Sequence, residues 1–146
     1  MNSDAFDPNK FKAGQVKSWD SVAEGWKKWW KTLEQITQSV TDCLIDMADI
    51  KPGQNVLDIA TGIGEPALTV AQKVGSSGNV TATDQSPQML AIAKDRAQEL
   101  GLSNVEFMES DSETLDIPGK KFDAIVCRWG LMFLPDPVTA LKSIKG

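Results

Sequence analysis

The sequence contains no histidine and no tyrosine. The absence of histidine excludes Ser-His-Asp and Cys-His catalysis, HExxH zinc sites and any histidine general base. Chemistry must therefore depend on carboxylates, on lysine or arginine, on backbone groups, or on a cofactor that brings its own reactivity. We expect no metal site, and no catalytic residue is identified.

Cysteine and long apolar runs are also scarce. Cys43 and Cys127 are too few and too far apart for a disulfide framework or a zinc knuckle, so we expect a reducing, cytoplasmic environment. The N-terminus lacks the apolar core of a signal peptide, and no run approaches the length of a membrane span. The net charge of −5 argues against nucleic acid as a partner.

The most informative stretch is Asn55 to Ala67, which reads NVLDIATGIGEPA. An apolar run carries one acid, Asp58, and then breaks into a turn with Gly62 and Gly64. Pro66 follows, a residue suited to the first turn of a helix. Strand, glycine turn and helix start are typical of a nucleotide site, because the glycines let the backbone approach a ligand and free helix N–H groups face its anionic part. A buried acid needs a partner, so Asp58 is the first functional candidate.

The remaining pattern predicts one α/β domain. Helical segments are expected at about 66–74, from Pro87 to Gly101, and after Pro137 up to Gly146. Strands are expected at 55–60, 80–83, 105–108 and from 122 or 123 to 127. Strands separated by helices imply βαβ units and a parallel sheet.

The N-terminal third is predicted to be a polar leader (1–14) and a helical lid (15–50), ahead of the α/β domain (51–146). Apolar residues recur in helical steps from Trp19, and Gly25 is expected to divide the segment into two helices or to bend it. Four tryptophans lie here, and Trp29 and Trp30 cannot share a face. Two interpretations stay open: the tryptophans cap a small core, or Trp19 and Trp26 form a lid over a ligand.

The fourth predicted strand leaves an exposed edge, which is a known liability. Another chain covers this edge, or the terminal helix folds over it, or the sequence is part of a longer protein. We predict a homodimer through the edge of this strand.

Three acids, Asp58, Asp84 and Asp111, lie at or near the predicted strand ends, where open α/β sheets bind ligands. Asp84 follows Gly62 by about 20 residues, the spacing at which an acid reaches a ribose. Asp111 could accept an exocyclic amine of a base. The spacing Gly62-x-Gly64-x-x-Ala67 also fits a nicotinamide dinucleotide, but Asp58 disfavours a pyrophosphate and favours a cationic ligand centre.

Three stretches in the chain read VLDIATGIGEP, TATDQSPQMLAIAKDRA and NVEFMESDSETLDIPGKKFDAIVCRWGLMFLPD. They resemble class I S-adenosylmethionine-dependent methyltransferases of the ubiquinone/menaquinone-biosynthesis type. The resemblance implies a Rossmann-like sheet of order 3-2-1-4 with helices on both faces, preceded by N-terminal helices. It implies S-adenosylmethionine as cofactor, S-adenosylhomocysteine as product, and in-line methyl transfer to a small-molecule acceptor. The family's K-P-G-G turn and last three strands are absent from the sequence, so a binding module without turnover is the alternative.

The resemblance also implies site residues. The loop at Asp58, Ala60, Thr61, Gly62 and Gly64 would hold the methionine moiety. Ala60 replaces the family's first glycine and adds a methyl group beside the ligand.

The other moieties have their own implied contacts. Asp84 would bind the ribose. Around the adenine, the implied neighbours are Gln85, Met89, Asp111 and Ser112, with Gln85 where an apolar residue is common. The implied lining of the methyl-donor pocket is Arg128 and Trp129, with Trp19 and Trp26 as lid residues.

Overall fold

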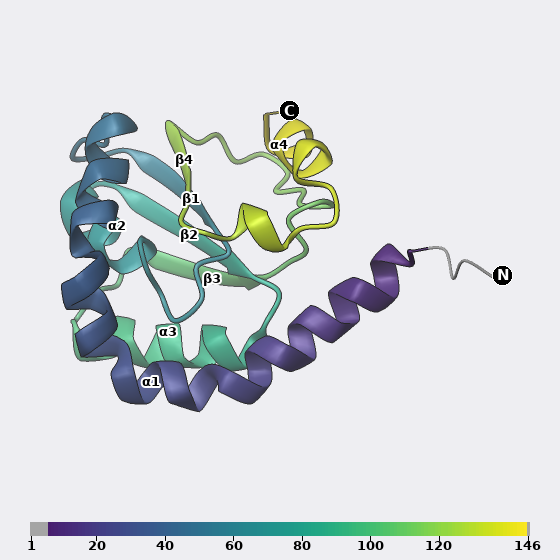
Figure 1. The fold of residues 1–146 in the computed structure, drawn as a ribbon. Coiled ribbons are helices and arrows are strands. Elements are labelled where there is room, and N and C mark those ends of the chain that lie inside the picture. Colours follow the sequence, from purple (N-terminus) through teal and green to yellow (C-terminus); the bar gives the residue numbers. More distant parts are fainter. Residues whose placement is uncertain (1–5, 146) are drawn as a thin grey trace, which may run out of the picture.

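Residues 6–145, as described by a computed structural model, form a four-stranded parallel sheet with helices on both faces (Figure 1). The spatial order is β3-β2-β1-β4, as expected. The strands are β1 (Asn55–Ile59), β2 (Asn79–Asp84), β3 (Val105–Glu109) and β4 (Ala124–Cys127). The short helices are α2 (Ala67–Val74), α3 (Pro87–Glu99), η1 (Leu131–Phe133) and α4 (Pro137–Lys145). Residues 1–5 of the predicted leader and the predicted helix stop at Gly146 lie outside the described residues.

The central strand β1 is buried on both faces because α2 and α4 lie on opposite sides of the sheet (Figure 1). Val56 packs on one face with α2 and with Ile45 near the end of the first helix. Leu57 and Ile59 pack on the other face, with Leu115 and, from α4, Ile144. Because β1 pairs in parallel with both β2 and β4, the carboxyl ends of these three strands lie at the same end of the sheet.

The first helix, α1 (Pro8–Met47), is one continuous element, so the leader predicted over residues 8–14 is wrong, and Gly25 does not divide the segment into two helices. The other alternative, a bend in this segment, agrees with the change of direction of α1 in Figure 1. Asp7 starts the helix early, since its carboxylate accepts the N–H groups of Asn9 and Lys10. A glycine inside a helix costs only about 1 kcal/mol. Packing of α1 against α3 offsets that cost.

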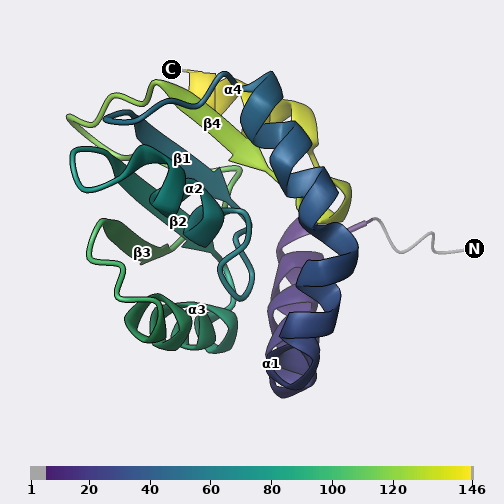
Figure 2. The ribbon, with the colours of Figure 1, turned by 90° about the vertical axis from the view of Figure 1, so that its left-hand side faces the viewer.

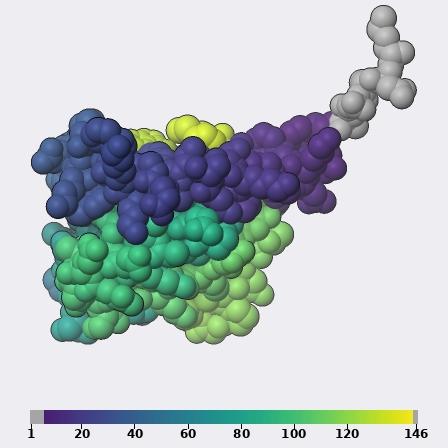
Figure 3. All heavy atoms as spheres, turned by 90° about the horizontal axis from the view of Figure 1, so that it is seen from below, coloured from purple at the N-terminus to yellow at the C-terminus, as the bar shows by residue number. Residues whose placement is uncertain are grey.

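The path of α1 explains how one helix covers so much of the molecule. It changes direction along its length and passes from the edge beside α3 to the side of the sheet near β4 (Figures 1 and 2). Seen from below, it forms an unbroken band along one side (Figure 3). None of the helices in the described part of the chain, α1 included, combines the length and apolarity that a bilayer span requires.

The outer edge of β4 has no pairing strand among residues 6–145. Ile125 on this strand is 41% exposed. The terminal helix α4 packs on the face of the sheet through Ile144 and does not cover Ile125. The alternative in which that helix shields the edge is therefore wrong.

Replacement of Gly25 by alanine tests the continuity of α1. An added Cβ has no heavy atom within 4 Å, so Gly25→Ala should raise the free energy of unfolding in urea by about 1 kcal/mol. Gly64→Ala is the contrasting variant, since Gly64 has a φ of 108° and its Cβ would lie 2.8 Å from Leu68 Cδ1. It should destabilise the fold. A loss of stability in Gly25→Ala would contradict a continuous helix.

Candidate functional site

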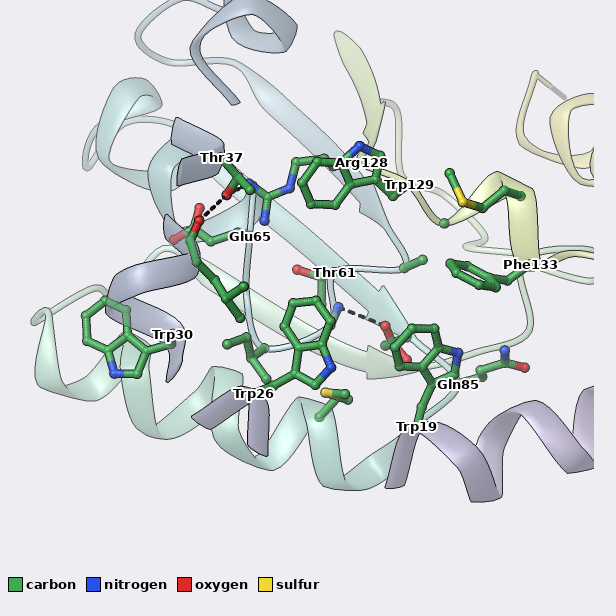
Figure 4. A pocket seen from close by; sticks show the side chains of 18 of the residues that line it. Trp19, Trp26, Trp30, Thr37, Thr61, Glu65, Gln85, Arg128, Trp129 and Phe133 are labelled. Atoms are coloured by element: carbon green, nitrogen blue, oxygen red, sulfur yellow. Dashed lines mark hydrogen bonds between the residues drawn. The ribbon is translucent and has the colours of Figure 1, made fainter. Parts of the chain in front are cut away.

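A cavity of about 490 Å³ lies at the carboxyl ends of β1, β2 and β4, beneath α1 (Figure 4). Its size is within the range of small-molecule sites, and its position is the ligand position of open α/β sheets. Of the predicted site residues, those in its lining are Trp19, Trp26, Ala60, Thr61, Gly62, Asp84, Gln85, Met89, Ser112, Arg128 and Trp129. Three predicted residues lie outside the lining: Asp58, Gly64 and Asp111.

The carboxylate of Asp84 joins the end of β2 to the turn after β1. Its Oδ2 accepts the Gly62 N–H at 2.8 Å, and its Oδ1 accepts the Ser86 N–H at 2.9 Å. A carboxylate offers about four lone-pair directions, so each oxygen can still accept one hydroxyl. Burial raises the pKa of Asp84, and the backbone donors partly offset this rise.

The two glycines of the turn have different tasks. Gly62 has a φ of 57° and faces open space, so its backbone is accessible from the cavity. Gly64 instead faces the protein, where Leu68 and Ala93 leave no room for a side chain. Gly64 therefore allows the turn to pack on α2 and α3, and its contact with the cofactor stays a prediction.

Asp58 lies beneath the cavity and is fully buried. Its Oδ2 accepts the Ala67 N–H at the start of α2 at 3.1 Å, whereas its Oδ1 has no hydrogen-bond partner. Burial raises the pKa of Asp58 to about 8, and the nearby Thr61 hydroxyl and the Ala67 N–H only partly oppose this rise. At neutral pH Asp58 is therefore mostly a neutral acid, and it orients the turn rather than lining the cavity.

Asp111 is held away from the cavity by α1. Its Oδ2 lies 2.8 Å from Lys12 Nζ, and Lys12 also pairs with Glu113. The two carboxylates raise the pKa of Lys12 although burial lowers it most strongly. Asp111 is thus ion-paired and outside the lining of the cavity, so its contact with an adenine amine stays a prediction, while Ser112 does line the cavity.

The turn at Ala60, after β1, and the turn at Trp129 and Gly130, after β4, approach each other closely. Ala60 has a φ of 56° and Trp129 a φ of 63°, both in the region that favours glycine. The neighbouring Gly130 has no space for a Cβ, which would lie 2.4 Å from that of Ala60. The methyl group that replaces the family's glycine therefore fills the gap between the turns.

Aromatic side chains of α1 both pack and line the cavity. The Trp19 ring lies 6.3 Å from that of Trp26 and meets Phe133 edge-on at 5.1 Å. The same tryptophans contact the buried cluster of Ala23, Ile63, Met89 and Ile92. The core and lid interpretations therefore both apply, while Trp29 is 57% exposed and belongs to neither.

The opposite end of the cavity is charged. We call it the polar end, and it consists of Glu34, Thr37, Glu65, Arg96 and Arg128. Figure 4 labels Thr37, Glu65 and Arg128 at this end. The buried Arg96 connects α1 to the turn after β1. It pairs with Glu34 of α1 at 3.4 Å and with Glu65 of the turn at 3.2 Å. It also donates to Ile63 O at 2.7 Å, and its guanidinium carbon lies 4.4 Å from the Trp30 ring centre. Burial raises the pKa of Glu65, opposed by Thr69 and Arg96.

Sequence reasoning missed several lining residues, among them Trp30, Leu33 and most of the polar end. Trp30, Leu33 and Thr37 continue the helical spacing from Trp19 and Trp26, so periodicity could have identified them. No local pattern marks Glu65 and Arg96, which are distant in the sequence and meet only in the fold.

Arg128, which follows β4, points toward α1 (Figure 4). Its Nη1 donates to Thr41 Oγ1 at 2.7 Å and to Thr37 Oγ1 at 3.2 Å. Its guanidinium carbon lies 4.8 Å from the centre of the Trp129 ring. Burial lowers its pKa, and Glu65, Asp58 and Glu34 act in the other direction.

Known methyltransferases are similar to this chain in sequence and in fold. A sequence profile of the ubiE/COQ5 methyltransferase family matches residues 17–145. Aklanonic acid methyltransferase DauC of Streptomyces sp. (strain C5) is 40% identical over 98 residues, 67% of this chain and 44% of DauC. The ubiquinone/menaquinone biosynthesis C-methyltransferase UbiE of Pseudomonas savastanoi pv. phaseolicola is 36% identical over 101 residues, 68% of this chain and 40% of UbiE.

The fold of the chain is also similar to that of a solved methyltransferase structure. The crystal structure of a SAM-dependent methyltransferase from Aquifex aeolicus matches with a TM-score of 0.69 at 25% identity, over 96% of this chain and 66% of that one. The chain thus spans less than half the length of the two curated relatives described above.

The buried acid gives a test by pH. The pKa of Asp58 rises from 3.8 to about 8 on folding, so between these values the folded chain keeps a proton that the unfolded chain releases. Asp58 therefore makes the free energy of unfolding fall with rising pH over this range, by at most about 1.4 kcal/mol per pH unit. The neutral variant Asp58→Asn should show a smaller decline in urea titrations between pH 5 and 8. The exposed variant Asp95→Asn is the control, and an unchanged slope in Asp58→Asn would contradict a neutral buried acid.

Proposed function

The chain belongs to the ubiE/COQ5 methyltransferase family, and we propose that it binds S-adenosylmethionine in the cavity beneath α1 and transfers the methyl group to a small-molecule acceptor. The observation that carries this proposal is the Asp84 carboxylate. It sits at the end of β2, holds the turn after β1 through the Gly62 N–H, and keeps lone pairs for the two hydroxyls of a ribose.

The cavity suits the two ends of this cofactor. Near Asp84, the side chains of Trp19, Gln85 and Met89 offer apolar and amide surface for a base. The polar end offers carboxylates and a guanidinium for an amino-acid group. The aromatic side chains between them exclude water.

A nicotinamide dinucleotide fits less well. Its pyrophosphate uses free N–H groups at the start of the helix after β1. Here the Ala67 N–H already donates to Asp58, and Glu65 adds a buried carboxylate beside the same turn. The helix start is therefore occupied by the protein's own acid.

The cofactor supplies a methyl group on a positively charged sulfur, which is already activated for displacement. The protein's contribution is then proximity and alignment. Asp84 would fix the ribose, and Trp19 and Phe133 would close the cavity against water. The lining contains no histidine, lysine or tyrosine that could move a proton from the acceptor.

Binding and turnover are separate parts of the proposal, since the chain spans less than half the length of DauC and UbiE. The acceptor is proposed only as a small molecule. A cytoplasmic location also stays a proposal, supported by two unpaired cysteines, Cys43 and Cys127.

Calorimetric titration tests the cofactor. We expect S-adenosylmethionine and S-adenosylhomocysteine to bind and NADH not to bind. Asp84→Ala should weaken both adenosyl ligands at least thirtyfold, because it removes the ribose acceptor and the anchor of the turn. Asp95→Asn should leave the affinities unchanged. Binding of NADH alone would overturn the proposal, and release of S-adenosylhomocysteine in the presence of candidate acceptors would separate turnover from binding.

We further propose a homodimer through the outer edge of β4, supported by its unpaired backbone and by the exposed Ile125. Sedimentation at increasing concentration should show a dimer in the unmodified chain. Ile125→Lys should shift it to monomer, since a charged edge opposes pairing. An unmodified chain that stays monomeric at high concentration would contradict this interface.

A further inference from the structure

We propose that Arg128 forms a carboxylate-binding subsite at the polar end of the cavity, held in place by Thr37 and Thr41 of α1. The ligand group it takes is the α-carboxylate of an amino acid, which under the proposed function is that of the methionine moiety. The inference therefore rests on cofactor binding, but it assigns a separate residue and a separate chemical group.

The first argument is the missing counter-ion. A buried guanidinium is costly unless a carboxylate or several acceptors compensate it. No carboxylate oxygen of residues 6–144 lies within 4.0 Å of the Arg128 nitrogens. The two other acidic residues of the polar end, Glu34 and Glu65, pair with Arg96 instead.

The second argument is the direction of the remaining donors. Only Nη1 of Arg128 is used, by the two threonine hydroxyls. Nε is buried without a partner, while Nη2 has no protein acceptor in the described structure and is not buried. Because Arg128 lines the cavity, Nη2 is the donor available to a ligand there.

The third argument is preorganisation. Two threonines on successive turns of α1 hold one side of the guanidinium, and the Trp129 ring lies against it. Trp129 keeps its unusual φ of 63° in this arrangement. A fixed, planar guanidinium loses little freedom when it binds a planar carboxylate. The threonines are thus positioning residues that connect α1 to the ligand.

The polar end also suits the other half of an amino-acid group. Glu65, whose Oε1 pairs with Arg96 and whose Oε2 accepts the Thr69 hydroxyl, lines the same end of the cavity (Figure 4). Carboxylates there favour the ammonium, and Arg128 favours the carboxylate. A zwitterion therefore fits this end better than an anion alone.

The test compares two ligands that differ only in the carboxylate: S-adenosylmethionine and its decarboxylated form. Dissociation constants are measured by calorimetry for the unmodified chain, for Arg128→Met and for Lys121→Met, an exposed control with the same change of residue type. We expect Arg128→Met to weaken S-adenosylmethionine at least thirtyfold and the decarboxylated ligand less than threefold. Lys121→Met should change neither.

Two further variants separate binding from folding. Arg128→Lys keeps the charge and should retain part of the preference for the carboxylate. Thr37→Val keeps the shape of the side chain and should weaken S-adenosylmethionine severalfold without affecting the decarboxylated ligand.

Equal weakening of both ligands in Arg128→Met and Arg128→Lys would show a structural role and overturn the inference. An unmodified chain that binds both ligands equally would overturn it as well. If the unmodified chain binds neither ligand, the proposed function itself fails.

Discussion

The hydrogen bond from the Gly62 N–H to Asp84 is the interaction on which the site depends. It fixes the turn after β1 against the end of β2, and so determines where backbone and carboxylate meet a ligand. Asp58 supports the same turn from below by accepting the Ala67 N–H. The two acids thus have different roles. Asp84 lines the cavity, whereas Asp58 is buried beneath it, and this burial strongly raises the pKa of Asp58.

The helix α1 forms one wall of the cavity above this turn. Its first half brings Trp19 and Trp26 over the ends of the strands, and Lys12 ties its start to the loop after β3. Its second half brings Thr37 and Thr41 to Arg128. One continuous helix therefore contributes side chains to both ends of the cavity.

The fold was largely predictable because β1 and β4 are short apolar runs, all four strands are separated by turns and helical segments, and parallel order follows from the intervening helices. The extent of α1 could not be predicted in the same way. Gly25 lowers helix stability and residues 8–14 are polar, so both argue locally against a helix. The Asp7 cap and the packing of α1 against α3 outweigh these effects. Asp84 could be identified by its spacing from Gly62. The ion pair of Asp111 with Lys12 could not be predicted, because the two residues are distant in the sequence.

The central claim is that the cavity has a ribose-binding end at Asp84 and an amino-acid end at Arg128. A crystal structure of the chain with S-adenosylhomocysteine tests it most directly. The account predicts both ribose hydroxyls within hydrogen-bond distance of the Asp84 carboxylate, and the ligand carboxylate at Arg128. A ligand bound in the reverse direction, or outside the cavity, would contradict it.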